Sequence, residues 1–406
     1  PCSRQKGARY ALLVLTGINL LNFADRYVPA AVKELIKDDL DLSDTETTYP
    51  TTGMIFVYMI CAGIFGYIAD KNVWDRRYIL AAAVVLWSLA TALAGLAQNL
   101  TQLVLLRSLV GVGEAAYSTI APPMISDFFP HADRNIAYAI YFLAIPVGGA
   151  LGFAIGSVLG GQFGWRVAFL GVGLPGVAAA VCVLLINNPS SKGEAGEKEG
   201  VTAWQMLWVD IWAIFSNRYF MCCLLGSIAN NFALGGLADW FPSFLVRYNN
   251  ISISEAGIIV GAATVLGGIG GNLLGAKSAQ YFDRRRVHNS YLIVSAVYTI
   301  PAAVFLLLLI NTTGNTALAV TFLFAAEICV WTCLAPITTI SISCIKPQLR
   351  AKSSAMQIFF QHVLGDMISP PIIGIISDST SSLQTGLQIT WMTVALSGLS
   401  WWLGGF

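Results

Sequence analysis

Arg107-Ser-Leu-Val-Gly-Val-Gly-Glu-Ala-Ala-Tyr-Ser-Thr119 decides the fold of this 406-residue chain, because it places two charges inside a long apolar segment. Arg107 and Glu114 are seven residues apart, so on a helix they lie on one side, about two turns apart. A charge at membrane depth costs roughly 2.5–3.5 kcal/mol on insertion scales, which indicates a paired or wet helix face. Gly111 and Gly113 thin the helix between the charges and allow another helix to approach closely.

The composition supports a membrane setting for this stretch. Hydrophobic residues make up 56% of the chain and charged residues only 11%, whereas soluble domains carry about 25% charged residues. The net charge of +1 gives no indication of a nucleic-acid partner. Most of the eight cysteines lie in apolar segments, where a free cysteine behaves as a small hydrophobe. We expect no cofactor and no metal site.

Apolar stretches of about 20 residues or more recur along the chain, and each is long enough to cross a bilayer. We predict spans at 9–32, 50–70, 78–97, 101–128, 136–160, 167–187, 217–245, 255–277, 289–311, 315–344, 351–376 and 384–404. The segment after residue 187 is rich in Pro, Ser, Gly, Lys and Glu, which is typical of a flexible linker. The prediction is therefore an all-α membrane protein of twelve helices. It has an N-terminal six-helix lobe (1–187), a cytosolic linker (188–216) and a C-terminal six-helix lobe (217–406).

The distribution of Lys and Arg predicts the orientation. With both termini in the cytosol, most basic residues, among them Arg76, Arg77 and Arg134, lie on the cytosolic side. The opposite side holds Lys33, Lys37, Arg166 and Arg247. Three glycosylation sequons begin at Asn99, Asn250 and Asn311. All three fall in or beside loops assigned to the non-cytosolic side, where glycosylation occurs.

The two predicted lobes echo each other with an offset of roughly 210 residues, as in transporters built from parallel repeats. The matching segments are Asp75-Arg76-Arg77 with Asp283-Arg284-Arg285, and Ala121-Pro122 then Arg134 with Ala335-Pro336 then Arg350.

This architecture resembles the major facilitator superfamily, whose loop after the second span reads Gly-x-x-x-Asp-Arg/Lys-x-Gly-Arg-Arg/Lys. Gly66, Asp70 and Lys71 fit its start and Arg76 and Arg77 its end, but about two extra residues intervene and the second Gly is absent. A narrower resemblance is to the Spinster family of lysolipid and sphingolipid transporters. It is carried by Asn22-Phe-Ala-Asp-Arg26, by residues 107–122, by Tyr141-Phe-Leu-Ala-Ile-Pro-Val-Gly-Gly149, and by Gln361-His-Val-Leu-Gly-Asp366 with Ser369-Pro370 and Ile376-Ser-Asp378.

Asp25 and Arg26 lie in the middle of the first span. The functional interpretation of Asp25 is a carboxylate that gains and loses a proton while Arg26 or Arg107 tunes its pKa, and the resemblance implies proton coupling here. The alternative is a structural ion pair. Arg26 and Arg107 are both candidate substrate contacts. Arg107 is either a clamp for an anionic head group, since its guanidinium suits phosphate or carboxylate, or a permanent partner of Asp25 or Glu114.

Further candidates lie in the same predicted span as Arg107 and in the span that follows it. Glu114 is either a proton carrier or gate, or a protonated carboxyl bonded to a carbonyl. Tyr117 and Tyr141 are candidates for hydrogen bonds to a head group, with packing as the alternative.

The C-terminal lobe adds several polar residues. The candidate substrate contacts are Asn230, Trp240 and Glu327, and Trp240 with Asp239 is either a gate or a wet boundary. His362 and Asp366 are four residues apart and share a helix face, so they are candidates for proton coupling that senses an acidic lumen, with a structural pair as the alternative.

The resemblance implies a cytosolic latch that holds the outward-facing state. Its candidate residues are Gly66, Asp70, Arg76, Arg77, Asp127 and Arg134, with Asp127 and Arg134 as the expected pair; the alternative is simple positive-inside bias.

We predict a secondary transporter, not an enzyme, that moves a lysophospholipid or sphingolipid-type amphiphile by proton-coupled alternating access. The lipid identity comes from the Spinster resemblance. One alternative is a proton-coupled carrier of a small organic anion or sugar; another is a non-transporting membrane receptor or scaffold. The expected partners are a lipid-like substrate, protons and membrane lipid, for a monomer in a lysosomal or other endomembrane rather than the plasma membrane.

Overall fold

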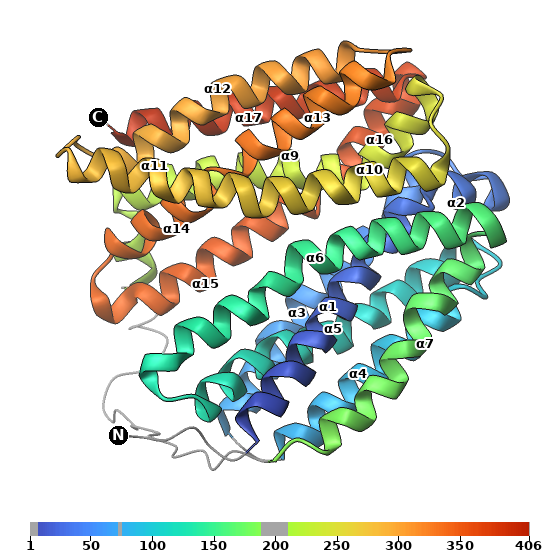
Figure 1. Ribbon diagram of the computed structural model, residues 1–406, viewed down its shortest axis with the longest axis horizontal. Helices are drawn as coiled ribbons and strands as arrows, with labels where there is room; N and C mark the ends of the chain where they lie inside the picture. Colours follow the sequence, from blue (N-terminus) through green and yellow to red (C-terminus); the bar gives the residue numbers. More distant parts are fainter. Residues whose placement is uncertain (1–6, 72–74, 188–209, 406) are drawn as a thin grey trace. The chain divides into compact units, whose positions relative to one another are not determined.

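The protein is described from a computed structural model that covers residues 7–71, 75–187 and 210–405 (Figure 1). The side chains of residues 67, 69–71, 131–132 and 351 lie outside the described residues. The described residues form helices and connecting loops, with no strand among them. Contacts divide the chain into two compact units. Unit 1 comprises residues 1–191, 238–265 and 377–381; unit 2 comprises residues 192–237, 266–376 and 382–406.

The first half of the chain supplies most of unit 1. Its elements are α1 (Ala8–Ala31), α2 (Lys33–Leu40), the 3-10 turn η1 (Glu46–Thr48), α3 (Tyr49–Lys71), α4 (Arg76–Ala94), α5 (Leu100–Phe128), α6 (His131–Phe163) and α7 (Trp165–Leu184). The end of α9 (Arg218–Asn249), almost all of α10 (Ile253–Leu266) and the end of α16 (Ser369–Thr380) complete it.

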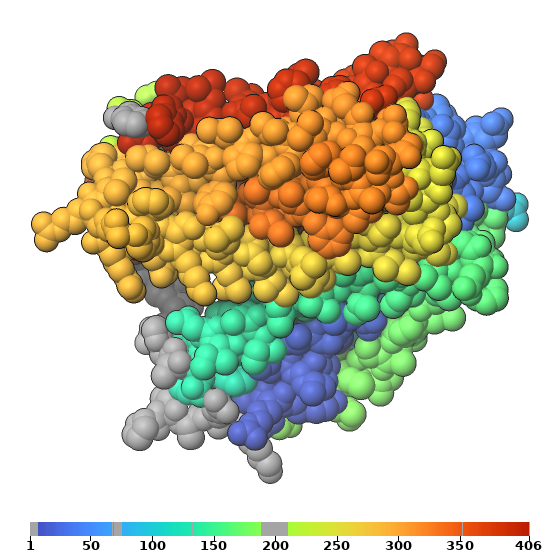
Figure 2. Space-filling model, turned by 45° about the horizontal axis from the view of Figure 1, so that its top comes forward, coloured from blue at the N-terminus to red at the C-terminus, as the bar shows by residue number. Residues whose placement is uncertain are grey.

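Unit 2 contains the start of α9 and most of α16. Its other elements are the π-turn η2 (Gly267–Gly271), α11 (Asn272–Arg284), α12 (Ser290–Asn311), α13 (Thr316–Trp331), α14 (Leu334–Ser343), the 3-10 turn η3 (Pro347–Leu349), α15 (Arg350–Gln361), the π-turn η4 (His362–Asp366) and α17 (Leu383–Gly405). In Figure 2, α12 and α13 lie side by side at the surface in orange.

Ten helical stretches of the described chain are long and apolar enough to cross a membrane. The helices α1 and α17, with 24 and 23 residues, occupy the other two predicted spans. On α12 the exposed apolar side chains Val297, Ile300, Val304 and Leu308 recur at three- and four-residue spacing along one helix face. Such a face is typical of a helix in contact with lipid.

The predicted role of the glycines in α5 is confirmed. A methyl group on Gly111 would lie 2.3 Å from the carbonyl oxygen of Met54 in α3, and one on Gly113 would lie 2.6 Å from that of Ala83 in α4. These glycines let α5 pack directly against the backbones of two neighbours. The close packing fixes the charged face of α5 within unit 1.

Candidate functional site

Asp25 and Arg107 form a buried ion pair between α1 and α5. Arg107 Nη1 donates to Asp25 Oδ1 over 2.8 Å, and the Arg107 side chain is 0% exposed. Thr91 Oγ1, on α4, donates to the other carboxylate oxygen of Asp25. Arg107 Nη2 also lies 3.0 Å from the Met54 sulfur. The carboxylate is therefore held by one charged and one neutral donor from two different helices.

Arg26 and Glu114 form a second ion pair beside the first. Arg26 Nη2 lies 2.7 Å from Glu114 Oε2, with 18% of the Arg26 side chain exposed and none of the Glu114 side chain. The guanidinium lies over the rings of Phe23 and Tyr58, at 5.2 and 5.3 Å from their centroids. The Arg26 side chain is therefore partly exposed, whereas the Arg107 side chain is fully buried.

The two pairs explain how adjacent residues on α1 both find partners. Asp25 and Arg26 point about 100° apart, and their partners on α5 are separated by two helical turns. Arg26 Nε, Arg107 Nε and Glu114 Oε1 are buried without a hydrogen-bond partner. These two donors and one acceptor are unsatisfied, which costs folding free energy that hydrogen-bonded groups would not cost. We refer to Asp25, Arg26, Arg107 and Glu114 as the charge quartet.

Two tyrosines near the quartet are packed into unit 1. The Tyr117 hydroxyl donates to the carbonyl oxygen of Leu15, and its ring meets Trp87 edge-on with centroids 5.4 Å apart. Tyr141 is buried, and its carbonyl oxygen accepts a hydrogen bond of 3.1 Å from Asn19 Nδ2. In this structure both tyrosines are buried, and substrate contact by either stays a prediction.

A second group of candidates lies in unit 2. His362 Nδ1 is 2.8 Å from Asp366 Oδ2, and the two residues begin and end the π-turn η4. Glu327 Oε2 accepts a hydrogen bond of 2.8 Å from Trp331 Nε1 on its own helix. The structure therefore brings His362 and Asp366 together as their spacing predicts, while their role in proton coupling stays a prediction.

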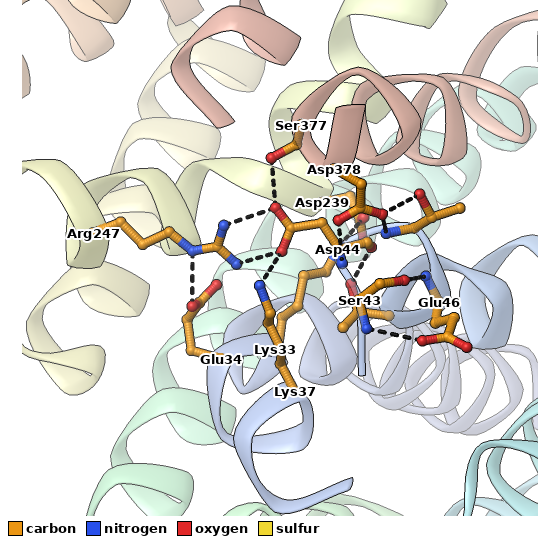
Figure 3. A network of polar contacts seen from close by, with 12 residues as sticks. Lys33, Glu34, Lys37, Ser43, Asp44, Glu46, Asp239, Arg247, Ser377 and Asp378 are labelled. Carbon is orange, nitrogen blue, oxygen red and sulfur yellow. Dashed lines mark hydrogen bonds and ion pairs between the residues drawn. The ribbon is translucent and has the colours of Figure 1, made fainter. Parts of the chain in front are cut away.

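A set of ionic contacts around α2 was not predicted as a site. We call it the α2 network, and Figure 3 shows it from close by. Its members are Lys33, Glu34, Lys37, Ser43, Asp44, Thr45, Glu46, Asp239, Arg247, Ser377 and Asp378. All of them belong to unit 1.

Asp44 is the centre of the α2 network. Both guanidinium ends of Arg247 lie 2.8 Å from its carboxylate oxygens, and Lys37 and Ser377 each donate over 2.5 Å. Burial alone would raise the pKa of Asp44, but the hydrogen bonds from Arg247, Lys37 and Ser377 outweigh it and hold this pKa well below its ordinary value. Asp44 therefore stays ionised at mildly acidic pH.

Lys33 and Asp239 form the buried end of the α2 network. Lys33 Nζ donates to Asp239 Oδ2 and lies 3.8 Å from the centroid of the Trp240 ring. Lys33 is 2% exposed, and Trp240 is fully buried. Trp240, predicted as a substrate contact, thus covers a lysine, and substrate contact by Trp240 stays a prediction. The sequence signal was a lysine directly after the first span with an acid-tryptophan pair near the end of the seventh.

The predicted latch residues find different partners from those expected. Asp127 pairs with Arg76 of α4 at 2.7 Å, so the expected pair of Asp127 with Arg134 is wrong. Arg134 Nε instead donates to the carbonyl oxygens of Ser126 and Phe129, which the end of α5 leaves unbonded. Arg350, its counterpart in the repeat, donates likewise to the Ile345 carbonyl oxygen.

The other latch residues surround the start of α4. Arg77 pairs with Asp75, and its hydrogen bonds lower the pKa of that carboxyl. Gly66 and Asp70 both lie in α3, with the Asp70 side chain outside the described residues. The latch function stays a prediction.

The three sequon asparagines are exposed at helix ends, in positions open to modification. Asn99 caps α5 by accepting from the Gln102 amide, Asn250 follows α9 with φ +53°, and Asn311 ends α12.

The sequence matches one family model and several known proteins. Residues 15–370 match the model of the Major Facilitator Superfamily. The chain is 32% identical over 383 residues to "Protein spinster" of Drosophila melanogaster, covering 91% of this chain but only 62% of that protein's length. It is 31% identical over 406 residues to "Sphingosine-1-phosphate transporter SPNS2" of Danio rerio, covering 95% of this chain and 79% of that protein.

Solved structures share the fold. One of them is the crystal structure of a bacterial homologue of the human lysosomal transporter Spinster, in an inward-facing and occupied conformation. That structure is similar with a TM-score of 0.82 and 22% identity over 99% of this chain and 98% of that one.

Proposed function

Because the chain belongs to the Spinster family of the major facilitator superfamily, we propose that it moves a lysophospholipid or sphingolipid-type amphiphile across a membrane, coupled to protons. The chain is an integral membrane transporter by family and fold. The lipid cargo is supported by the similarity to a sphingosine-1-phosphate transporter. The observation that carries the proton coupling is the charge quartet, in which two buried carboxylates are each paired with a guanidinium.

The charge balance of the quartet couples the binding of a proton to the binding of an anion. With both carboxylates ionised, Asp25 and Glu114 neutralise Arg26 and Arg107. A proton on either carboxylate leaves one guanidinium without its counter-charge in a poorly solvated site, and an anionic head group can then take the place of that carboxylate. Binding of the proton and of the anion thus favour each other.

The exposure of the two arginines divides their roles. Arg26 is partly exposed and lies over two aromatic rings, so protonation of Glu114 makes it available to a phosphate. Arg107 is enclosed and hydrogen-bonds only within unit 1 among the contacts described, so it is better placed to tune Asp25. Arg26 is therefore the proposed head-group contact and Arg107 the proposed regulator of a proton site.

The α2 network supplies the proposed gate. It connects α2 and the loop after it, which the sequence assigns to the N-terminal lobe, with α9 and α16, which the sequence assigns to the C-terminal lobe. The distribution of Lys and Arg assigns these contacts to the luminal end. Alternating access requires such a set of contacts to break when the luminal side opens. The cytosolic pair of Arg76 and Asp127 is the proposed latch residue pair on the other side.

Uptake into proteoliposomes with an imposed pH gradient tests this function. Radiolabelled lysophosphatidylcholine, sphingosine phosphate and a small organic acid are compared, with the gradient collapsed by a proton ionophore as the control. We expect one of the two lipids to move, and to move faster with the gradient. If only the organic acid moves, the chain is a small-anion carrier; if the lipid moves equally without the gradient, the proton coupling is refuted.

A further inference from the structure

Unit 2 contains a small cavity lined by amide side chains. It has a volume of about 190 Å³ and lies among α9, α13, α14, α15 and α17. The polar side chains that carry the argument are those of Ser227, Asn230, Asn231, Gln357, Gln361 and His362. We call it the amide cavity. Whole-ligand cavities usually measure about 300–1,000 Å³, so the amide cavity suits one part of a larger molecule.

Asn230 lines the amide cavity and carries a hydrogen-bond acceptor that has no partner. The residue is 6% exposed, and its side-chain Oδ1 is buried without any hydrogen-bond partner. A buried acceptor left unpaired costs about 1–3 kcal/mol, which a ligand recovers when it supplies a donor. Nearby, Gln357 Nε2 donates to Ser227 Oγ over a long 3.4 Å, so these two groups can also turn towards a ligand at small cost.

The lining of the amide cavity favours a neutral occupant. None of the described residues that line it is Lys, Arg, Asp or Glu. His362, which lines it, is already hydrogen-bonded to Asp366. A phosphate would therefore find no counter-charge in the lining, whereas a neutral hydroxyl can donate to one amide and accept from another.

We propose that the amide cavity binds the free hydroxyl of an amphiphile head, with Asn230 Oδ1 accepting its hydrogen bond. This inference rests on the proposed function and names the chemical feature by which the cargo is selected. A lysophospholipid has a free glycerol hydroxyl where a diacyl phospholipid has its second acyl chain. A sphingoid phosphate carries an ammonium on the carbon next to its phosphate-bearing carbon and a free hydroxyl one carbon further along. Both cargo types therefore offer a hydroxyl donor close to the phosphate, and diacylphosphatidylcholine, whose glycerol hydroxyls are both esterified, lacks it.

Transport of paired analogues tests the hydroxyl contact with the full chain in proteoliposomes. The probes are lysophosphatidylcholine with its 2-deoxy analogue, and sphinganine phosphate with its 3-deoxy analogue. The unsubstituted protein is expected to transport the deoxy member roughly 5- to 10-fold less efficiently, the value of one hydrogen bond. Asn230→Leu, which keeps the side-chain size, is expected to reduce this ratio to about 1.

Asn272→Leu is the matched control. Asn272, at the start of α11, also has a buried Oδ1 without a partner, but it does not line the amide cavity. It should keep the ratio of the unsubstituted protein. If the unsubstituted protein transports the deoxy analogue as well as the hydroxyl-bearing lipid, the inference is overturned while lipid transport stays intact. This measurement does not depend on the folding of any variant. A ratio unchanged by Asn230→Leu would overturn the role of Asn230. If no lipid moves at all, the proposed function fails and the inference with it.

Discussion

Replacing Asp239 by Asn should strongly weaken the buried end of the α2 network. The substitution keeps the shape of the side chain but leaves Lys33, which is 2% exposed, without its counter-charge. Removing one partner of a buried ion pair costs about 3–5 kcal/mol. The ring of Trp240 stays over Lys33 in both proteins, so it does not offset the difference.

The titration of Lys33 limits this cost. Burial lowers the pKa of Lys33, and Asp239 is the largest influence that opposes it. In Asp239→Asn this pKa falls further, and the lysine can lose its proton instead of remaining charged. Loss of a proton at pH 7 by a group with an ordinary pKa of about 10.4 costs about 4.6 kcal/mol. We therefore expect a loss of about 3 to 4.6 kcal/mol.

The sign of the pH dependence follows from the same titration. Between the lowered folded pKa of Lys33 and about 10.4, the unfolded chain binds more protons than the folded chain, so stability rises with pH. Each protein has this slope above its own folded pKa of Lys33, and the folded pKa is the lower one in Asp239→Asn. The deficit of Asp239→Asn should therefore shrink between these two pKa values and grow nowhere between pH 7 and pH 10. The double variant Lys33→Met with Asp239→Leu should be within about 1 kcal/mol of the unsubstituted protein or more stable, since apolar residues often replace a buried pair without loss.

Unfolding in mixed detergent micelles, followed by tryptophan fluorescence, measures these free energies. The double-mutant cycle needs the single variants Lys33→Met and Asp239→Leu as well. If the losses of the single variants add up in the double variant, Lys33 and Asp239 are not coupled and the assignment of a closed gate at this pair is wrong. A deficit of Asp239→Asn that grows between pH 7 and pH 10 would refute the titration argument.

Three further outcomes follow from the same structure. Asp25→Asn should remove the pH dependence of lipid uptake. It leaves Arg107 without its counter-charge, at the cost of about 3–5 kcal/mol of a broken buried pair, but Thr91 and Arg107 can still hydrogen-bond its side chain, so we expect a folded variant with a lowered melting temperature; unchanged pH dependence in uptake assays would move the proton site to Glu114 or His362. Gly111→Ala should lower the melting temperature markedly, by a loss of about 1–3 kcal/mol from overpacking, since its methyl group would lie 2.3 Å from a carbonyl oxygen; an unchanged melting temperature would contradict the close packing of α5. The lowered pKa of Asp44 means that its contribution is present above an unfolded pKa of about 3.9 and is lost only as the pH falls through the folded value. The stability difference between the unsubstituted protein and Asp44→Asn should thus be constant from pH 7 to pH 5, and a difference that vanishes by pH 5 would refute it.

The fold was largely predictable because its signals are local. Runs of apolar residues longer than 18 mark spanning helices wherever they occur, and Gly111 and Gly113 predicted close approach through their lack of a side chain. The spacing of Arg107 and Glu114 likewise predicted a shared helix face, on which each now holds a partner from α1.

Pairing across helices was harder to predict, because it depends on the rotation of each helix about its axis. The sequence left open whether Arg26, Arg107 or neither would hold Asp25, and the structure gives Arg107 to Asp25 and Arg26 to Glu114. The pairing of Asp127 with Arg134 failed for a different reason. Arg134 donates to carbonyl oxygens at the end of α5 instead of pairing with Asp127. Sequence spacing does not show that these oxygens compete with the carboxylate for the arginine.

The α2 network was missed because its members are far apart in the sequence. Asp44 meets Arg247 and Ser377, more than 200 and 300 residues away. In the sequence Lys33, Lys37 and Arg247 appeared only as charges that set the membrane orientation, Asp239 as a candidate gate with Trp240, and Ser377 and Asp378 as part of the motif shared with the Spinster family. A basic residue on the side where few are found, such as Lys33 or Arg247, was the signal that a specific partner exists.

Proton movement driven by the lipid cargo tests the central claim most directly. Proteoliposomes that contain the full chain and a pH-sensitive dye in their lumen receive lysophosphatidylcholine or sphingosine phosphate from outside, and dye signal and lipid uptake are recorded together. The charge quartet predicts a change in luminal pH that accompanies lipid uptake in the unsubstituted protein and is absent in Asp25→Asn. Lipid uptake without any change in luminal pH would contradict proton coupling, and neither uptake nor a pH change with either lipid would contradict the proposed cargo.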